Sequence, residues 1–410
     1  MQQHTAVAGM QVIVEEFQGE GEVEGRSWSR GKDDEVPCRR EEARRNQAEP
    51  KSLALGHPAA YVTGPELAAA VRTALILRKP LLLTGNPGTG KSELAERIAY
   101  EFGIGPVLRF EAQSLSEASD LFYRYDHIRQ MIVAKLAERH VERADEANPE
   151  NFITLGPLGE AIVRSALAAH QEIKGSPAGQ GRPADRQGLL NSADASLYQR
   201  LLADGPDPVG RRSVVLIDEI DKASRDFPND LLNGIARMQF EIVELGRRLI
   251  KGADLNQRPH LHPIVVITSN SERDLPPPFL RRCVFCHVPD PTRQQLAAIV
   301  RRRVFQDYDT DPKPEESDRL PPLYSRLLGA FMRVRDSNKD ALRYQVSTSE
   351  LMDFMTAARH QGLDGRDLAS ADKDKLLSVI SALAKHQDDV PQLRKLLELE
   401  LASPIPASGT

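Results

Sequence analysis

The 410-residue chain is poor in cysteine and in aromatic residues. It has three cysteines, one tryptophan and 5% aromatic residues in all. Three thiols cannot form the disulfide framework that stabilises small secreted domains, and unpaired thiols suit a reducing compartment. We therefore predict a cytoplasmic protein whose folded parts are held together by ordinary apolar cores.

Long apolar runs and a net basic charge are also absent. Apolar stretches such as residues 214–217 are far shorter than the ~20 residues that a membrane span requires. The N-terminus shows no basic segment followed by an apolar one, the pattern of a secretory signal. The formal net charge is -5 at pH 7, so general attraction to nucleic acid is not expected. We predict no membrane insertion and regard nucleic acid as an unfavoured partner.

Charge and periodicity divide the chain into consecutive parts. Residues 1–50 carry dense mixed charge and few aliphatic side chains, which predicts a disordered arm. Residues 51–290 alternate apolar strands with helical patterns and so predict an α/β fold, a parallel sheet flanked by helices, with a flexible insertion around 174–188. Residues 291–402 contain helical patterns alone, which predicts a smaller all-helical domain, and residues 403–410 form a short tail.

Four runs in the α/β part are mostly apolar without alternation, as expected of parallel strands that are covered on both faces. These predicted strands are residues 81–84, 214–217, 264–268 and 284–288. Residues 126–169 are expected to be mostly helical. The helices predicted in the C-terminal part are 294–305, 321–335, 349–361, 372–386 and 390–401.

The first motif that carries chemistry lies between the first apolar strand and a helical pattern. Residues 85–92 read Gly-Asn-Pro-Gly-Thr-Gly-Lys-Ser, the P-loop spacing, in which glycines let backbone N–H groups turn toward phosphates at a helix N-terminus. Lys91 is predicted to reach the β- and γ-phosphates, and the Ser92 hydroxyl to ligate Mg²⁺. The residues predicted to bind ATP are Gly85, Asn86, Pro87, Gly88, Thr89, Gly90, Lys91, Ser92 and Asp218.

Two later apolar strands end in polar side chains. Asp218 and Glu219 follow the second strand, where Asp218 is predicted to hold Mg²⁺ and Glu219 to act as the base that polarises an attacking water. Asn270 follows the third strand and is predicted to position that water or to sense the γ-phosphate; the alternative is an ordinary turn start. This order of motifs predicts that the protein hydrolyses ATP as well as binding it.

With these three strand ends in place, residues 61–362 resemble the AAA+ ATPases, specifically the MoxR-like branch. Besides the P-loop, the similarity is carried by residues 120–126, 217–223 and 227–232. The resemblance implies an ATP site between neighbouring subunits of a ring, usually a hexamer. It also implies an arginine finger from the neighbour, for which Arg282 is the first candidate and Arg281 the second.

The resemblance further implies that ATP hydrolysis remodels or activates a protein partner. Proteins with a von Willebrand factor A domain are commonly paired with MoxR-like ATPases, and such a protein is the expected partner here. Two alternatives stay open. One is an assembly switch that binds ATP but hardly hydrolyses it, and the other is a nucleic-acid motor, for which residues 301–303, three consecutive arginines, form the conspicuous basic cluster.

The C-terminal part departs from the family pattern, which places an arginine at the start of a helix there. Residues 347–350 read Ser-Thr-Ser-Glu, which instead predicts a capping box with Ser347 as N-cap. Arg343 is the alternative arginine for contact with the nucleotide. Residues 283–287 match the Cys-x-x-Cys-His pattern of haem attachment, but no secretory signal is seen and a core strand is expected there, so haem is not predicted. Zinc is not predicted either, because the sequence offers no second ligand pair at a suitable spacing.

Overall fold

The computed structural model describes most of the chain between residues 57 and 402. The described residues are 28–29, 35–36, 57–137, 147–175, 190–203, 210–254, 256–305, 320–336, 343, 346–363 and 370–402. Almost all of the insertion predicted around 174–188, and the tail at 403–410, lie outside them. Within the arm predicted to be disordered, strands β1 (Trp28–Ser29) and β2 (Glu35–Val36) pair as a short antiparallel ribbon.

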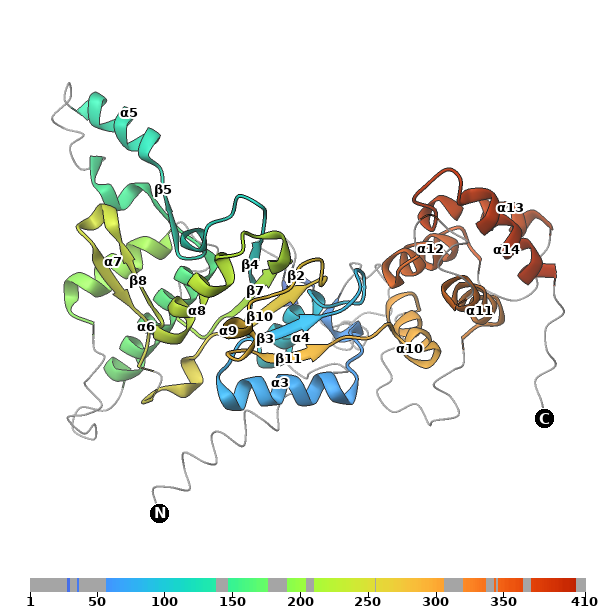
Figure 1. Ribbon diagram of the computed structural model, residues 1–410, viewed down its shortest axis with the longest axis horizontal. Helices are drawn as coiled ribbons and strands as arrows, with labels where there is room; N and C mark the ends of the chain where they lie inside the picture. Colours follow the sequence, from blue (N-terminus) through green and yellow to red (C-terminus); the bar gives the residue numbers. More distant parts are fainter. Residues whose placement is uncertain are drawn as a thin grey trace, which may run out of the picture.

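A five-stranded parallel sheet lies at the centre of the α/β part (Figure 1). Its strands are β3 (Leu81–Thr84), β4 (Leu108–Glu111), β7 (Val214–Asp218), β10 (Ile264–Ser269) and β11 (Val284–His287), in the spatial order β11-β3-β10-β7-β4. The four predicted strands are confirmed, as is the α/β class, but the expected cover on both faces is wrong for β11, which lies at the edge of the sheet and leaves Phe285 exposed. Because all five strands run in the same direction, the P-loop and the polar residues after β7 and β10 meet at one edge of the sheet.

The described residues after Pro291 form helices, which lie beside the α/β part in Figure 1. These helices are α10 (Arg293–Arg303), α11 (Pro322–Asp336), α12 (Thr348–His360), α13 (Ser370–Ser378) and α14 (Val390–Ala402). They enclose an apolar core of their own. The prediction of one helix over 372–386 was wrong: α13 ends at Ser378, and a 3-10 turn at Ile380–Ala382 brings Ile380 and Leu383 into that core.

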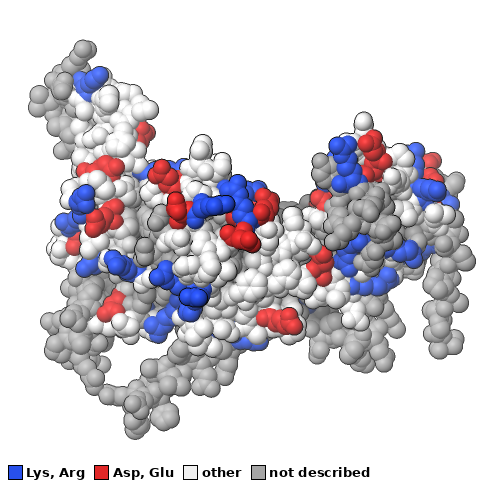
Figure 2. All heavy atoms as spheres, in the orientation of Figure 1, with Lys and Arg blue, Asp and Glu red and all other residues white. Residues whose placement is uncertain are grey.

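Basic and acidic side chains are interspersed over the face of the molecule drawn in Figure 2, and neither sign dominates that face. This distribution agrees with the near balance of charges in the sequence. Within the described ranges, no helix combines the length and the apolarity that crossing a membrane requires.

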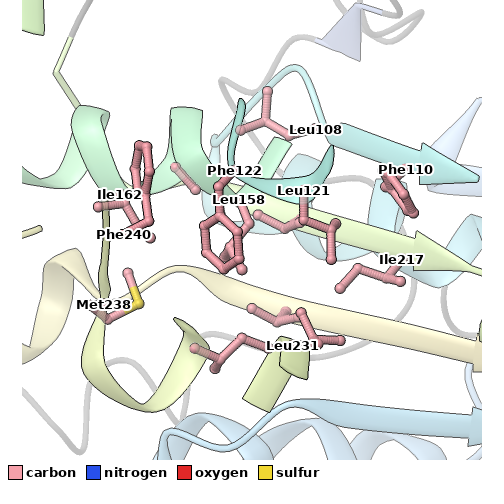
Figure 3. Close-up of a cluster of buried hydrophobic side chains, with 14 of the residues drawn as sticks. Leu108, Phe110, Leu121, Phe122, Leu158, Ile162, Ile217, Leu231, Met238 and Phe240 are labelled. Carbon is pink, nitrogen blue, oxygen red and sulfur yellow. The ribbon is translucent and has the colours of Figure 1, made fainter. Parts of the chain in front are cut away.

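The strands bury alternate side chains on the two faces of the sheet, as a pleated strand must. Leu81 and Leu83 of β3 pack against α3 (Pro65–Leu77) and α4 (Glu93–Phe102). Leu82 faces the opposite cluster, which also holds residues of α6 (Pro157–Gly175), α7 (Ser192–Ala203) and α8 (Phe227–Arg237). Figure 3 shows part of this second cluster, where Leu108 and Phe110 of β4 lie near Leu121 and Phe122.

Two antiparallel strand pairs extend the α/β part beyond the sheet. One pairs β5 (Tyr123–Tyr125) with β6 (Ile153–Leu155), and the other pairs β8 (Gln239–Ile242) with β9 (Arg248–Lys251). The helical prediction for 126–169 was therefore only partly right, because β6 separates α5 (His127–Ala137) from α6. The Tyr123 hydroxyl joins the two pairs, since it accepts a hydrogen bond from Val243 N (3.1 Å) and donates one to Glu244 Oε2 (3.0 Å), both in the turn between β8 and β9.

Candidate functional site

The P-loop joins β3 to α4 and requires glycine at two positions for steric reasons. Gly85 and Gly88 have positive φ angles of 146° and 77°, which side chains rarely allow. A Cβ atom on Gly85 would lie 2.3 Å from the carbonyl oxygen of Val288, and one on Gly88 would lie 2.6 Å from Ser347 Oγ. The loop is therefore packed between β11 on one side and the start of α12 on the other.

Lys91 places its ammonium group inside this loop. Its Nζ donates to the carbonyl oxygens of Gly85 and Asn86, each at 2.8 Å. Burial lowers the pKa of Lys91, and the nearby carboxylates, led by Asp218, act in the opposite direction. The ammonium group thus lies where the loop curves inward, next to a concentration of negative charge.

Ser92 and Asp218 meet directly beside Lys91. Ser92 Oγ donates to Asp218 Oδ1 at 2.8 Å, and the Thr268 hydroxyl donates to the same oxygen. Thr268 Oγ1 in turn accepts a hydrogen bond from Glu219 N at 2.9 Å. A hydroxyl and a carboxylate side by side are the hard oxygen ligands that Mg²⁺ prefers, so this pair fits the predicted metal site.

Glu219 and Asn270 are also in contact, as expected for residues at neighbouring strand ends. Asn270 Nδ2 donates to Glu219 Oε1 at 3.0 Å, while Lys222 Nζ pairs with Glu219 Oε2 at 2.5 Å. Glu219 itself has a left-handed backbone conformation with φ of 55°. Such a conformation is strained for a residue with a side chain and is typical of functional positions.

Sequence reasoning missed Asp221, which fixes the loop that carries Asn270. Asp221 is buried (2% exposed) and accepts hydrogen bonds from Asn270 N at 3.2 Å and from Glu272 N at 3.0 Å. It also missed Thr268, although a hydroxyl near the end of an otherwise apolar strand was a visible signal. Asp221 offered no such signal, because its partners lie about fifty residues later in the chain.

We expect Asp221→Ala to destabilise the fold and to lower turnover, because it leaves two partly buried N–H groups without their acceptor. An unsatisfied buried donor costs about 1–3 kcal/mol, and partial burial places these groups toward the lower end, so the midpoint of thermal unfolding should fall by a few degrees. Asp221→Asn keeps an acceptor oxygen, so its midpoint of thermal unfolding should fall by less. The exposed Asp274→Ala is the matched control. Equal midpoints for Asp221→Ala and Asp274→Ala would contradict the anchoring role.

Residues 80–283 match the family described as AAA domain (dynein-related subfamily). Over these residues the α/β part of the chain has the fold of an AAA+ domain. A comparison with curated proteins gives no significant match. The matched segment runs from the start of β3 to the start of β11 and includes the P-loop, Asp218, Glu219 and Asn270. This match supports nucleotide binding and ATPase activity for the domain.

A cavity of about 630 Å³ connects the AAA+ domain with the helical part. Its walls come from the P-loop and the strand ends, from residues 60–62, 64–67 and 286–292, and from α10 and α12. Lys91, Asp218, Glu219 and Asn270 all line it. The cavity is large enough for a nucleotide, whose typical sites enclose several hundred cubic ångströms.

The predicted arginines lie outside this cavity. Arg281 and Arg282 follow α9 (Pro277–Leu280) and are exposed, and neither contributes to the cavity wall that the described residues form. Arg343 contacts the segment just before α14, where its Nη1 lies 3.0 Å from His386 Nε2 and 3.7 Å from Asp388 Oδ2. The helix start at Ser347 is the predicted capping box, with Glu350 accepting from Ser347 N at 2.7 Å.

The two cysteines of the Cys-x-x-Cys-His pattern lie on or next to β11 of the AAA+ domain. Burial raises the pKa of Cys283 to about 12 and also raises that of Cys286, so both thiols stay protonated at neutral pH. A protonated thiol is a poor metal ligand. Over the ranges that the structure describes, no group of three potential metal-binding side chains comes together.

Proposed function

We propose that this protein is a MoxR-like AAA+ ATPase that hydrolyses ATP with Mg²⁺ and uses the energy to remodel or activate a protein partner. The observation that supports this proposal is the meeting of Ser92, Asp218, Glu219 and Asn270 at one edge of the sheet, beside the P-loop. ATP binding alone would require only the P-loop. Hydrolysis also requires a base that activates water, and Glu219, held in place by the Asn270 amide, is suited to that role.

The P-loop residues bind and orient the phosphates. Backbone N–H groups of the loop, which Pro87 alone lacks, surround them, and the Lys91 ammonium exchanges its carbonyl partners for the β- and γ-phosphate oxygens. Ser92 and Asp218 would hold Mg²⁺, one through its hydroxyl and the other through its carboxylate. When bound there, Mg²⁺ neutralises charge that builds on the phosphate oxygens.

Glu219 acts as the base, and Asn270 orients it. A carboxylate has about four lone-pair sites, and the contacts with Asn270 and Lys222 use two of them. The others are available to accept a proton from water, while Asn270 keeps the carboxylate directed toward the cavity. Thr268 supports both acids, since it bonds Asp218 through its hydroxyl hydrogen and Glu219 N through its oxygen.

A ring of subunits would complete the site. Arg281 and Arg282 are exposed and outside their own cavity, so their charge can stabilise the transition state only in a neighbouring subunit. We propose a homo-oligomer, usually a hexamer in MoxR-like ATPases. A cytoplasmic location and a partner with a von Willebrand factor A domain belong to the same proposal.

The nucleic-acid motor is the less favoured alternative because its basic cluster is largely engaged within the protein. Arg302 is buried and donates to the Tyr61 carbonyl oxygen at 3.3 Å, and Arg303 is paired with Glu93. Two of the three clustered arginines are therefore committed to contacts with the AAA+ domain. Such a cluster is not the exposed basic stripe that backbone phosphates require.

Mixing two inactive variants tests the shared site. We expect Arg282→Ala and Lys91→Ala each to be nearly inactive and a mixture of the two to regain measurable ATPase activity. In a mixed ring, an Arg282→Ala subunit has an intact P-loop and receives Arg282 from a Lys91→Ala neighbour. The measurement is phosphate release at a fixed total protein concentration, with Arg281→Ala tested in parallel to identify the finger.

A second mixture serves as the control for this experiment. Glu219→Gln mixed with Lys91→Ala should stay inactive, because each subunit carries a defect in its own half of the site. Recovery in this control, or no recovery in the first mixture when rings form, would contradict an arginine acting between subunits. Activity that is the same in a monomeric protein at every concentration would contradict it as well.

A further inference from the structure

The first helix of the helical part touches the AAA+ domain at two adjacent arginines. Arg302 of α10 donates to the Tyr61 carbonyl oxygen, and Arg303 pairs with the Glu93 carboxylate. Glu93 is the residue directly after Ser92 and begins α4. The pair therefore joins the helical part to the residue next to the predicted Mg²⁺ ligand.

This contact lies in the wall of the nucleotide cavity. Glu93 and Arg303 both line it, and their side chains are 40% and 19% exposed. The Tyr61 ring and the Glu93 carboxylate also pack against the P-loop, since a Cβ on Gly90 would lie 3.3 Å from Tyr61 Cε2 and 3.5 Å from Glu93 Oε2. The P-loop, Tyr61, Glu93 and Arg303 thus form one continuous set of contacts.

We propose that Arg303 is a positioning residue that holds the helical part closed over the bound nucleotide by pairing with Glu93. This inference rests on the proposed function, because it takes the cavity to hold ATP or ADP. The helix start at Ser347 offers hydroxyl groups where the family pattern has an arginine, and Arg343 faces His386 instead. Arg303 supplies the cationic link between the helical part and the site from a different helix.

Closure through this pair has a consequence for nucleotide release. While the pair is formed, α10 remains against α4, and the nucleotide has to wait for the helical part to move before it leaves. Without the pair, the buried Arg302 contact and the packing of Ser347 on Gly88 remain, so the protein still folds but opens more often. Release should therefore accelerate, with little change in the chemistry at Glu219.

The test is the release rate of a fluorescent ADP analogue from the full chain, measured by rapid mixing with excess ADP. We expect Arg303→Ala and Glu93→Ala each to release it about fivefold faster, since a partly exposed ion pair contributes up to about that factor. The KM for ATP should rise by a similar factor, while kcat changes by less than about twofold. Arg394→Ala, an exposed arginine of α14, is the matched control and should behave as the wild type.

Charge reversal separates pairing from a loss of folding. Glu93→Arg and Arg303→Glu should each release ADP faster than the wild type, and the double variant that combines them should release it at close to the wild-type rate. Arg303→Lys, which keeps the positive charge, should also release ADP at close to the wild-type rate. Alanine variants that match the wild type, or a double reversal no better than its parents, would overturn the proposal. If the wild type binds no nucleotide, both the proposed function and this inference are wrong. If the wild type hydrolyses ATP but the Arg303 and Glu93 variants release ADP at the wild-type rate, this inference alone is wrong.

Discussion

Replacing Lys91 with alanine weakens ATP binding by about a hundredfold or more. The Lys91 ammonium is directed into the P-loop, and each charge-assisted hydrogen bond that it makes to a phosphate oxygen is worth about 1.5–3 kcal/mol. Losing two such bonds costs more than 2.7 kcal/mol, which corresponds to two factors of ten in affinity. The measurement is calorimetric titration with a slowly hydrolysed ATP analogue.

Lys395→Ala is the control for this prediction, because that lysine is exposed on α14, outside the wall of the cavity. Thermal unfolding of both variants shows whether the fold survives, and added ATP should raise the midpoint for Lys395→Ala but not for Lys91→Ala. An ATP affinity of Lys91→Ala within threefold of the wild type would show that the loop does not hold phosphates through this side chain.

The central strands could be predicted from sequence because they are buried on both faces. β3, β7 and β10 are continuous in apolar residues, and such runs are typical of parallel strands inside a layered fold. β11 and β4 are the two edge strands; β11 was predicted because most of its residues are apolar, whereas β4 escaped prediction because buried Leu108 and Phe110 alternate with exposed Arg109 and Glu111. The alternation of apolar and polar residues in β4 is visible in the sequence, but four residues are too few to distinguish a strand from a loop.

The residues of the site also differ in how far they could be predicted from the sequence. The P-loop and the acidic pair carry their chemistry in contiguous residues, so their spacing alone indicated them. Asp221 and Thr268 act through partners about fifty residues away, and Arg303 acts through Glu93, which is 210 residues earlier in the chain. Only the folded sheet and the docked α10 bring these groups together. The arginine finger is harder still to identify from the sequence, because the phosphates that it is proposed to contact are bound by another subunit.

Replacing Glu219 with glutamine lowers hydrolysis by about two to three orders of magnitude while ATP stays bound. General base catalysis typically contributes 10²–10⁴-fold, and glutamine removes the basic oxygen but keeps the size of the side chain. The amide oxygen can still accept from Asn270 Nδ2, so the geometry of the strand end is preserved. Single-turnover phosphate release measures the loss, and titration with ATP should give a dissociation constant within about twofold of the wild type.

Glu241→Gln, an exposed position on β8, is the matched control and should hydrolyse ATP normally. Unchanged turnover in Glu219→Gln would remove the proposed base and favour an assembly switch that scarcely uses hydrolysis. Because the glutamine variant keeps ATP, it also provides the means to test remodelling: a protein substrate retained by Glu219→Gln with ATP should be released by the wild type as it hydrolyses ATP. We expect a protein partner to be held in the ATP-bound state, which Glu219→Gln maintains. If this variant retains nucleic acid alone, or nothing, the proposal that the AAA+ domain acts on a protein is wrong.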